Sequence, residues 1–161
     1  MKEITIIRHG KSSWDFDVDD KDRPLKERGI NDAILVSNHF NKELTPPDIV
    51  FSSPANRALH TCVIFMRQLE ISMSKVIITD QLYDFGGSSV TNFIKQLDDR
   101  YNNVMIFGHN HAFTSISNIF GDKFIENLPT AGVVKIKFDV AHWSDIKKGV
   151  TELIIFPKKF K

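Results

Sequence analysis

Short apolar runs alternate along the chain with longer stretches whose apolar residues recur every three to four positions. The short runs, rich in Ile, Val and Phe, are typical of buried strands, and they cover residues 4–7, 49–51, 76–78, 104–107, 133–138 and 151–156. The longer stretches predict helices over residues 24–40, 53–69, 89–100 and 112–120. This order predicts an α/β fold, a three-layer sandwich in which helices flank a mostly parallel central sheet. The last two strands could pair antiparallel at one side.

Two local signals place helix ends. Pro46 and Pro47 end the first helix. Ser53 followed by Pro54 is typical of an N-cap and a first helical residue, so the second helix is expected to begin there. The single cysteine, Cys62, falls on the apolar face of that helix and is expected to be an inert core residue.

Composition indicates one domain over residues 1–161, with 42% hydrophobic and 25% charged residues. A net charge of +1 gives no reason to expect nucleic acid as a partner. No apolar run is long enough to span a membrane, and the N-terminus lacks the pattern of a signal peptide. One cysteine allows no internal disulfide. We therefore expect a cytoplasmic protein with neither nucleic acid nor membrane as a partner.

Charged and polar residues follow three of the predicted strands directly. Arg8-His9-Gly10 follows the first strand, Ser53-Pro54 with Arg57 follows the second, and Gly108-His109-Asn110 follows the fourth. Parallel strands share one edge at their carboxyl ends, where ligands bind in open α/β sheets. Two histidines and two arginines that are far apart in the sequence are thus expected to meet.

This set of side chains suits phosphoryl transfer. Arginine presents a planar, permanently charged fork that matches phosphate oxygens, and a neutral imidazole can form a covalent phosphoryl intermediate. His9 is the stronger nucleophile candidate because Gly10 allows close approach, and His109 then fits a role in binding the phosphate. No cofactor is expected. His109 and His111 form a His-x-His pair, but no further ligand follows at metal-binding spacing, so no metal is expected either.

These motifs resemble the histidine phosphatase superfamily, which has the phosphoglycerate mutase-like fold. The matching residues are Arg8, His9, Gly10 and Ser12, then Asp22-Arg23-Pro24-Leu25 and Gly29, then Ser53-Pro54-Ala55, Arg57-Ala58 and Thr61, and finally Gly108-His109-Asn110. The short chain and residues 126–132 look most like the bacterial phosphohistidine phosphatases of the SixA type. The resemblance implies that His9 is phosphorylated and that Arg8, Arg57 and His109 complete the phosphate pocket. Gly10, Ser12 and Asn110 are candidates for contact with phosphate or substrate, although turn formation would explain Ser12 and Asn110 nearly as well.

Some positions depart from the family pattern. Lys26 stands where the family often has Thr, and His111 stands where many members have Pro. Larger members carry a carboxylic acid that protonates the leaving group, and Asp84 is the nearest candidate by position, although its match is loose. The acidic stretch from Asp15 to Asp22 is interpreted as a solvated loop at the rim of the pocket.

The leading hypothesis is a metal-independent phosphatase that acts through phospho-His9, with phosphohistidine on a protein as substrate. A phosphoramidate such as phosphohistidine has a good leaving group once its ring is protonated, so a strong general acid is less necessary. One alternative is a phosphomonoesterase for a small metabolite, with Asp84 as its general acid. Another is a non-catalytic module that binds phosphate.

Overall fold

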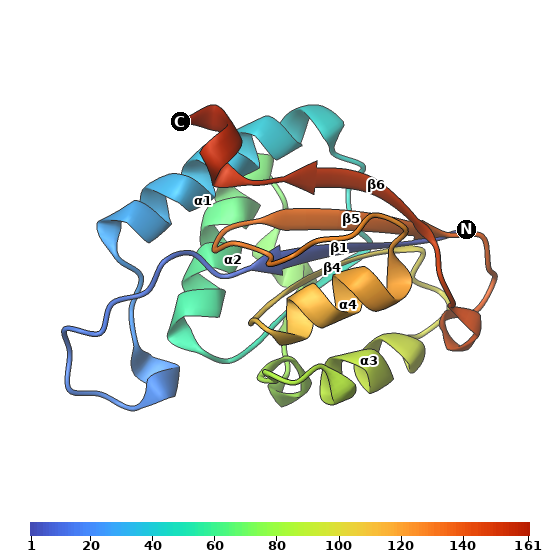
Figure 1. The fold of residues 1–161 in the computed structure, drawn as a ribbon, viewed down its shortest axis with the longest axis horizontal. Helices are drawn as coiled ribbons and strands as arrows, with labels where there is room; N and C mark the ends of the chain where they lie inside the picture. The colour runs from blue at the N-terminus through green and yellow to red at the C-terminus, as the bar shows by residue number, and fades with distance from the viewer.

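A computed structural model describes residues 1–161, which form a single six-stranded sheet in the order β3-β2-β4-β1-β5-β6 (Figure 1). The strands are β1 (Lys2–Arg8), β2 (Ile49–Ser52), β3 (Val76–Ile78), β4 (Asn103–Gly108), β5 (Val133–Phe138) and β6 (Val150–Ile155). The first four pair in parallel, and β5 and β6 continue the sheet antiparallel beyond β1. The predicted mostly parallel sheet is confirmed, with the last two strands antiparallel at one side.

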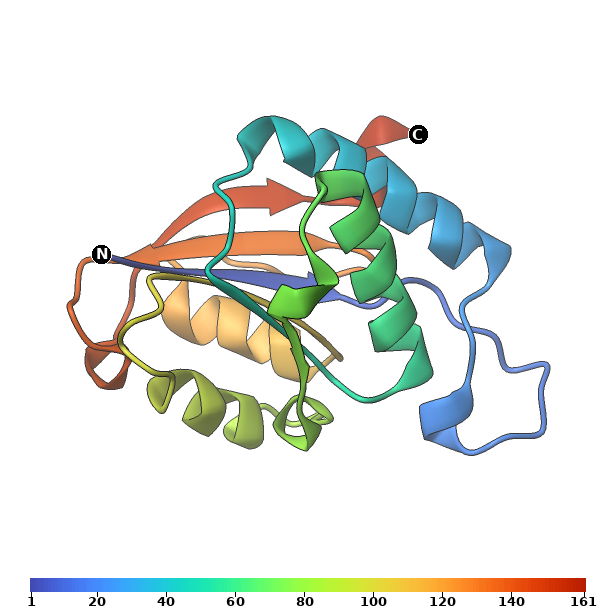
Figure 2. The ribbon, with the colours of Figure 1, turned by 180° about the vertical axis from the view of Figure 1, so that it is seen from behind.

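Two pairs of helices cover the two faces of the sheet. They are α1 (Glu27–Phe40), α2 (Asn56–Leu69), α3 (Ser88–Lys95) and α4 (Ala112–Phe120). Figure 1 shows α4 in front of the sheet, and Figure 2, from behind, shows α2 in front of it. The architecture is therefore the predicted three-layer sandwich.

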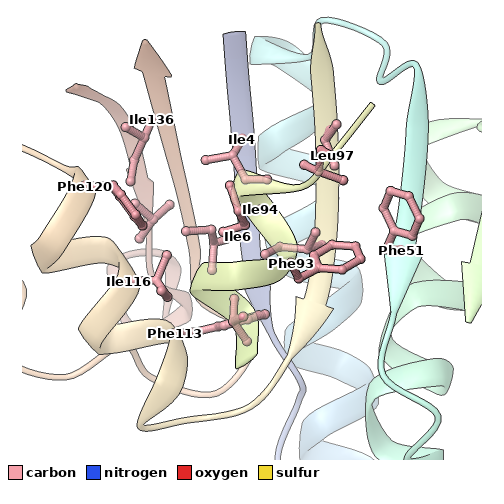
Figure 3. Close-up of a cluster of buried hydrophobic side chains, with 14 of the residues drawn as sticks. Ile4, Ile6, Phe51, Phe93, Ile94, Leu97, Phe113, Ile116, Phe120 and Ile136 are labelled. Carbon is pink, nitrogen blue, oxygen red and sulfur yellow. The ribbon is translucent and has the colours of Figure 1, made fainter. Parts of the chain in front are cut away.

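Each face of the sheet has its own apolar core, because alternate side chains of a strand point to opposite faces. Ile4 and Ile6 of β1 pack with Phe93, Phe113 and other side chains of α3 and α4 (Figure 3). On the opposite face, Ile7 and Met105 pack against α1 and α2 in a second cluster. Cys62 lies fully buried in that second cluster, as predicted, and burial raises the pKa of its thiol to about 12.

Helix ends differ from the prediction where polar groups compete for the backbone. The first helix begins at Glu27 and not at Pro24, because Leu25 pairs with Ser12 in an isolated antiparallel bridge. The third helix ends at Lys95, before the predicted end at residue 100. The predicted N-cap at Ser53 is wrong: Ala55 is the N-cap of α2, and its N–H donates to the Ser53 hydroxyl at 3.2 Å. No helix is long and apolar enough to cross a bilayer.

The connection between β1 and α1 projects beyond the carboxyl end of β1 (Figures 1 and 2). It contains a short 3-10 turn at Asp20–Asp22, which contacts the beginning of α2. This connection, hereafter the β1–α1 loop (residues 9–26), forms one wall of the cavity at the carboxyl edge of the sheet.

Candidate active site

The carboxyl edge of the sheet brings together the four side chains predicted from the three strand ends. Arg8 ends β1 opposite Gly108 of β4, so His9 and His109 follow neighbouring parallel strands. Their imidazole centroids lie 5.3 Å apart. Arg8, His9 and Arg57 line one cavity of about 310 Å³. The predicted convergence is therefore present in the structure, with His109 fully buried next to His9 and not among the residues that line the cavity.

The ring of His9 is held in one orientation by the backbone carbonyl of the next residue, Gly10. Its Nδ1 lies 2.7 Å from the carbonyl oxygen of Gly10, and a carbonyl can only accept, so Nδ1 carries the hydrogen. The lone pair is consequently on Nε2. Burial lowers the pKa of His9 to about 3, and the nearby His109, Arg57 and Arg8 act in the same direction. His9 is thus neutral near pH 7, with Nε2 in the nucleophilic form.

The segment that carries His9 is fixed by main-chain contacts. The Gly10 N–H donates to the Thr61 hydroxyl of α2 at 2.9 Å, and that hydroxyl donates to the carbonyl of Arg57 at 2.8 Å. A Cβ on Gly10 would stand 2.7 Å from the carbonyl oxygen of Gly29, and a Cβ on Gly29 would collide with the carbonyl of Lys11. The backbone after β1 therefore packs directly on the first turn of α1, with no room for a side chain at either glycine.

The guanidinium group of Arg8 is only partly hydrogen-bonded within the protein. Its Nη1 donates to the carbonyl of Leu128 at 2.9 Å, whereas Nε is buried without a hydrogen-bond partner. The Ala131 N–H donates to the carbonyl oxygens of Arg8 and His9 at 3.1 and 3.0 Å. Residues 126–132, which carried part of the family resemblance, thus hold the end of β1 in place.

His109 is fully buried and bonded to Ser53. The Ser53 hydroxyl lies 2.8 Å from Nε2 of His109 and also accepts from the Ala55 N–H at 3.2 Å. When Ser53 donates to Nε2, the hydrogen of the neutral ring sits on Nδ1, and Nδ1 is buried without a partner. Burial lowers the pKa of His109 to about 3, helped by the charge of Arg57. The rings of Tyr83 and Phe85 cover it, with centroids 5.4 and 4.9 Å away.

Arg57 is almost completely buried and is bound by the β1–α1 loop. Its Nη1 donates to the carbonyl of Asp20 at 2.6 Å, and its Nη2 donates to the Asp20 carboxylate at 3.0 Å. That carboxylate also accepts from the Tyr83 hydroxyl at 2.5 Å and from Arg23 at 3.3 Å. Most of the acidic stretch is exposed, as predicted, but Asp20 lines the cavity.

Comparison with known proteins places this site in a family. The sequence model of the histidine phosphatase superfamily (branch 1) matches residues 4–88. The chain belongs to this superfamily. The protein is therefore a phosphatase of the histidine phosphatase type, as its motifs predicted.

Relatives of this histidine phosphatase cover nearly its whole length. An uncharacterized protein of Mycobacterium tuberculosis (strain H37Rv) is 25% identical over 160 residues, which cover 93% of this chain and 98% of that protein. Among solved structures, the protein histidine phosphatase SixA complexed with tungstate has a TM-score of 0.82 at 19% identity, with 99% of both chains covered. The mycobacterial glucosyl-3-phosphoglycerate phosphatase complexed with VO3 has a TM-score of 0.68 at 13% identity, with 95% of this chain and 98% of that chain covered. The predicted phosphoglycerate mutase-like fold is confirmed.

The other predicted site residues of the phosphatase have different surroundings. Ser12 lines the cavity, and its hydroxyl accepts from Arg23 Nη2 at 2.5 Å. Asn110 does not line it: its amide oxygen accepts from the N–H of Thr114 at 3.2 Å, and its amide nitrogen donates to Asn127 at 2.7 Å. Asn110 therefore ties α4 to residues 126–132.

Asp84 also lies outside the cavity lining. Its carboxylate accepts from the N–H groups of Gly86, Gly87 and Val90 at 3.0 to 3.1 Å, so it caps the start of α3. No group of three His, Cys, Asp or Glu side chains is placed to hold a metal ion.

Sequence reasoning did not single out several side chains that line the cavity of the phosphatase. These are Lys11, Trp14, Asp20, Phe85 and Thr130, with Arg23 recognised only as part of a motif. The guanidinium carbon of Arg23 lies 3.2 Å from the ring centroid of Trp14. Asp20 had no signal that separated it from the four other aspartates of its loop, and Phe85 comes from a connection with no periodicity.

Proposed function

We propose that this phosphatase transfers a phosphoryl group to Nε2 of His9 and then to water, and that its substrate is phosphohistidine on a protein. Arg8, Arg57 and His109 bind the phosphoryl oxygens, and His9 is the nucleophile. The first step forms a P–N bond to His9 as the bond to the leaving group breaks. In the second step water attacks phosphorus, the electron pair of the P–N bond returns to His9, and the proton lost by the water is released to solvent with the phosphate.

The observation that carries this proposal is a pair of buried side-chain nitrogens, one on Arg8 and one on His109, that have no hydrogen-bond partner. The N–H of Arg8 Nε has no acceptor in the protein, and neither has Nδ1 of His109. Buried polar groups are almost always paired, and an orphaned one costs about 1–3 kcal/mol. Phosphoryl oxygens are acceptors, so a bound phosphoryl group would satisfy the Arg8 N–H, and it would also satisfy His109 Nδ1 in the tautomer in which Ser53 donates to Nε2.

The charge distribution supports nucleophilic chemistry over mere binding. The equatorial oxygens of a phosphoryl group carry the charge that the transition state redistributes, and preorganised cations stabilise it. Arg8 and Arg57 supply two permanent positive charges at the cavity. A simple phosphate-binding module would have no use for a neutral imidazole whose Nδ1 is tied to a carbonyl and whose Nε2 is left as a nucleophile.

The surroundings of the carboxylates favour phosphohistidine over a phosphomonoester. An alkoxide leaving group needs a proton from a general acid, whereas a protonated imidazole does not. Asp84 is occupied as the cap of α3, and Asp20, the carboxylate in the cavity, is held ionised by its partners. The likeness to the protein histidine phosphatase SixA supports the same substrate class. The likeness to a glucosyl-3-phosphoglycerate phosphatase supports the small-metabolite alternative, so the test below also includes a phosphomonoester.

The test compares wild-type protein, His9→Ala and His111→Ala on a phosphohistidine peptide and on p-nitrophenyl phosphate. His111 is exposed and lies outside the cavity lining, so it is the matched control. We expect His9→Ala to lose at least about 1,000-fold in rate and His111→Ala to match wild type. Labelled phosphate should be trapped on His9 after a quench that avoids acid. A wild-type protein that releases no phosphate from the peptide, or a His9→Ala variant as active as wild type, would rule the proposal out.

A further inference from the structure

Asp20 places a carboxylate inside a cavity otherwise built to bind an anion. Its side chain is 41% exposed and lines the cavity together with His9 and Arg8. One of its oxygens accepts from both Arg57 and the Tyr83 hydroxyl, and the other accepts from Arg23. Three elements therefore hold the carboxylate: the β1–α1 loop, α2 and the segment before α3.

This carboxylate is ionised near neutral pH. Burial alone would raise the pKa of Asp20, but hydrogen bonds from Tyr83 and Arg57 outweigh it and lower the pKa to about 2. The charged or titratable groups that face it are Arg57 on α2, Arg23 and Lys21 on its own loop, Tyr83, and His109 behind Tyr83. A fixed negative charge is thus part of the cavity wall.

A fixed negative charge has opposite effects on two classes of substrate. A phosphomonoester brings only negative charge to this cavity, so the carboxylate opposes its binding. A phosphohistidine whose ring is protonated brings a phosphoryl group together with a flat cation, and a carboxylate nearby stabilises that cation. Trp14 and Phe85, which are 74% and 44% exposed, line the same cavity and offer aromatic surface to such a ring.

We propose that Asp20 selects for phosphohistidine substrates whose ring is protonated, and against phosphomonoesters, by stabilising that imidazolium ring next to His9 before it leaves. This inference rests on the proposed function and names the residue that sets its substrate class. The lone pair of His9 Nε2 forms the new P–N bond while the substrate's P–N bond breaks toward its own nitrogen. The substrate ring, protonated at its other nitrogen, leaves as neutral imidazole, and phospho-His9, which keeps its hydrogen on Nδ1, carries the positive charge. No proton has to be transferred in this step.

A purely structural role for Asp20, that of holding Arg57, predicts a different pattern. Loss of Arg57 positioning would weaken phosphate binding for every substrate by a similar factor. If Asp20 selects by charge, its removal should instead change the activities on the two substrate classes in opposite directions. Asp20→Asn separates these roles because it removes the charge and keeps an amide oxygen that can still accept from Arg57.

The experiment measures kcat/KM of wild type, Asp20→Asn and Asp19→Asn on a phosphohistidine peptide and on p-nitrophenyl phosphate. Asp19 is the preceding residue, exposed and without a side-chain hydrogen bond, so Asp19→Asn makes the same charge change outside the cavity. We expect Asp20→Asn to lower activity on the peptide about tenfold, the equivalent of about one pKa unit on the bound ring, and to raise activity on p-nitrophenyl phosphate. Asp19→Asn should leave the ratio of the two activities unchanged.

A second readout is the pH dependence of kcat on the phosphohistidine peptide. The ring must be protonated to leave, so kcat falls as the pH rises above the pKa of the bound ring. Asp20 raises that pKa, and the alkaline fall in wild type should therefore lie about one pH unit above that of Asp20→Asn. Equal losses on both substrates, unchanged activity on both, or superimposable pH profiles would each overturn the inference. Failure of the proposed function is distinct, because wild type itself would then be inactive on the peptide.

Discussion

The hydroxyl of Ser53 lies 2.8 Å from Nε2 of His109, and both side chains are fully buried. In the proposed mechanism Ser53 donates to Nε2, which places the hydrogen of the neutral His109 ring on Nδ1, where it can bind the phosphoryl group. The sequence pattern assigned Ser53 to a helix cap. Its hydroxyl instead connects the end of β2 to the residue that follows β4.

Removal of this hydroxyl should slow the phosphatase without unfolding it. In Ser53→Ala the neutral ring of His109 is free to put its hydrogen on Nε2, and we expect kcat to fall about tenfold, the equivalent of one lost hydrogen bond. Nitrogen NMR of His109 should show the change of tautomer directly. Ser52→Ala is the matched control, because the Ser52 hydroxyl is buried next in sequence but bonds to the Ser53 carbonyl. An unchanged tautomer in Ser53→Ala would contradict the role given to Ser53.

The hydroxyl of Thr61 should matter for both stability and rate. Thr61→Val leaves the buried Gly10 N–H without its acceptor, which costs about 1–3 kcal/mol of the free energy of unfolding. Because the carbonyl of the same Gly10 orients His9, kcat should also fall. Thr61→Ser keeps the hydroxyl and should retain most of both. Urea denaturation and steady-state kinetics measure the two effects, and a Thr61→Val variant as stable as Thr61→Ser would contradict this account.

Replacement of Gly29 by alanine should destabilise the protein, whereas the same replacement in an ordinary helix is stabilising. Alanine in place of glycine normally stabilises a helix by about 1 kcal/mol. At Gly29, in the first turn of α1, the new Cβ would collide with the carbonyl of Lys11, and such overpacking typically costs about 1–3 kcal/mol. Asn31→Ala, at an exposed position of the same helix, should be neutral or stabilising. Urea midpoints of the two variants test the difference in sign.

The activity on a phosphomonoester should show no acidic limb that belongs to His9. The pKa of the free imidazole is lowered from 6.5 to about 3, so the nucleophile is neutral above pH 3 and protonates only below it. The pH profile of kcat/KM reports groups of the free enzyme. After correction for ionisation of the substrate, it should be flat between about pH 5 and 7. A fall in kcat/KM below about pH 6.5 that remains after this correction would show that His9 titrates with its ordinary pKa, and would contradict the prediction.

Asp84 should act on stability more than on chemistry. Asp84→Ala removes the acceptor for three backbone N–H groups at the start of α3, and we expect it to cost about 1 kcal/mol, as for other helix caps. Activity on a phosphohistidine peptide should be nearly unchanged. If Asp84→Asn lost activity on p-nitrophenyl phosphate with a shifted pH profile, Asp84 would instead be the general acid of the small-metabolite alternative.

The parts of this molecule that sequence predicts well are those set by local pattern. Strand runs such as residues 104–107 are apolar throughout, and the motif residues His9 and His109 follow strands directly, so topology alone brings them together. Ser53 was misassigned because a serine before proline satisfies the local rule for a cap, and only the tertiary contact with His109 overrides it. Asp20 could not be predicted as a site residue for a related reason. Only the folded chain brings it to its three partners, Arg23, Arg57 and Tyr83.

The close approach of Gly10 to Gly29 has a consequence for how this enzyme can diverge. The aim of the nucleophile depends on main chain packed against main chain, whereas the wall that faces the leaving group is made of loop side chains such as Trp14 and Asp20. Mutations in that wall can change which phosphorylated compounds are accepted while the orientation of the His9 ring is preserved.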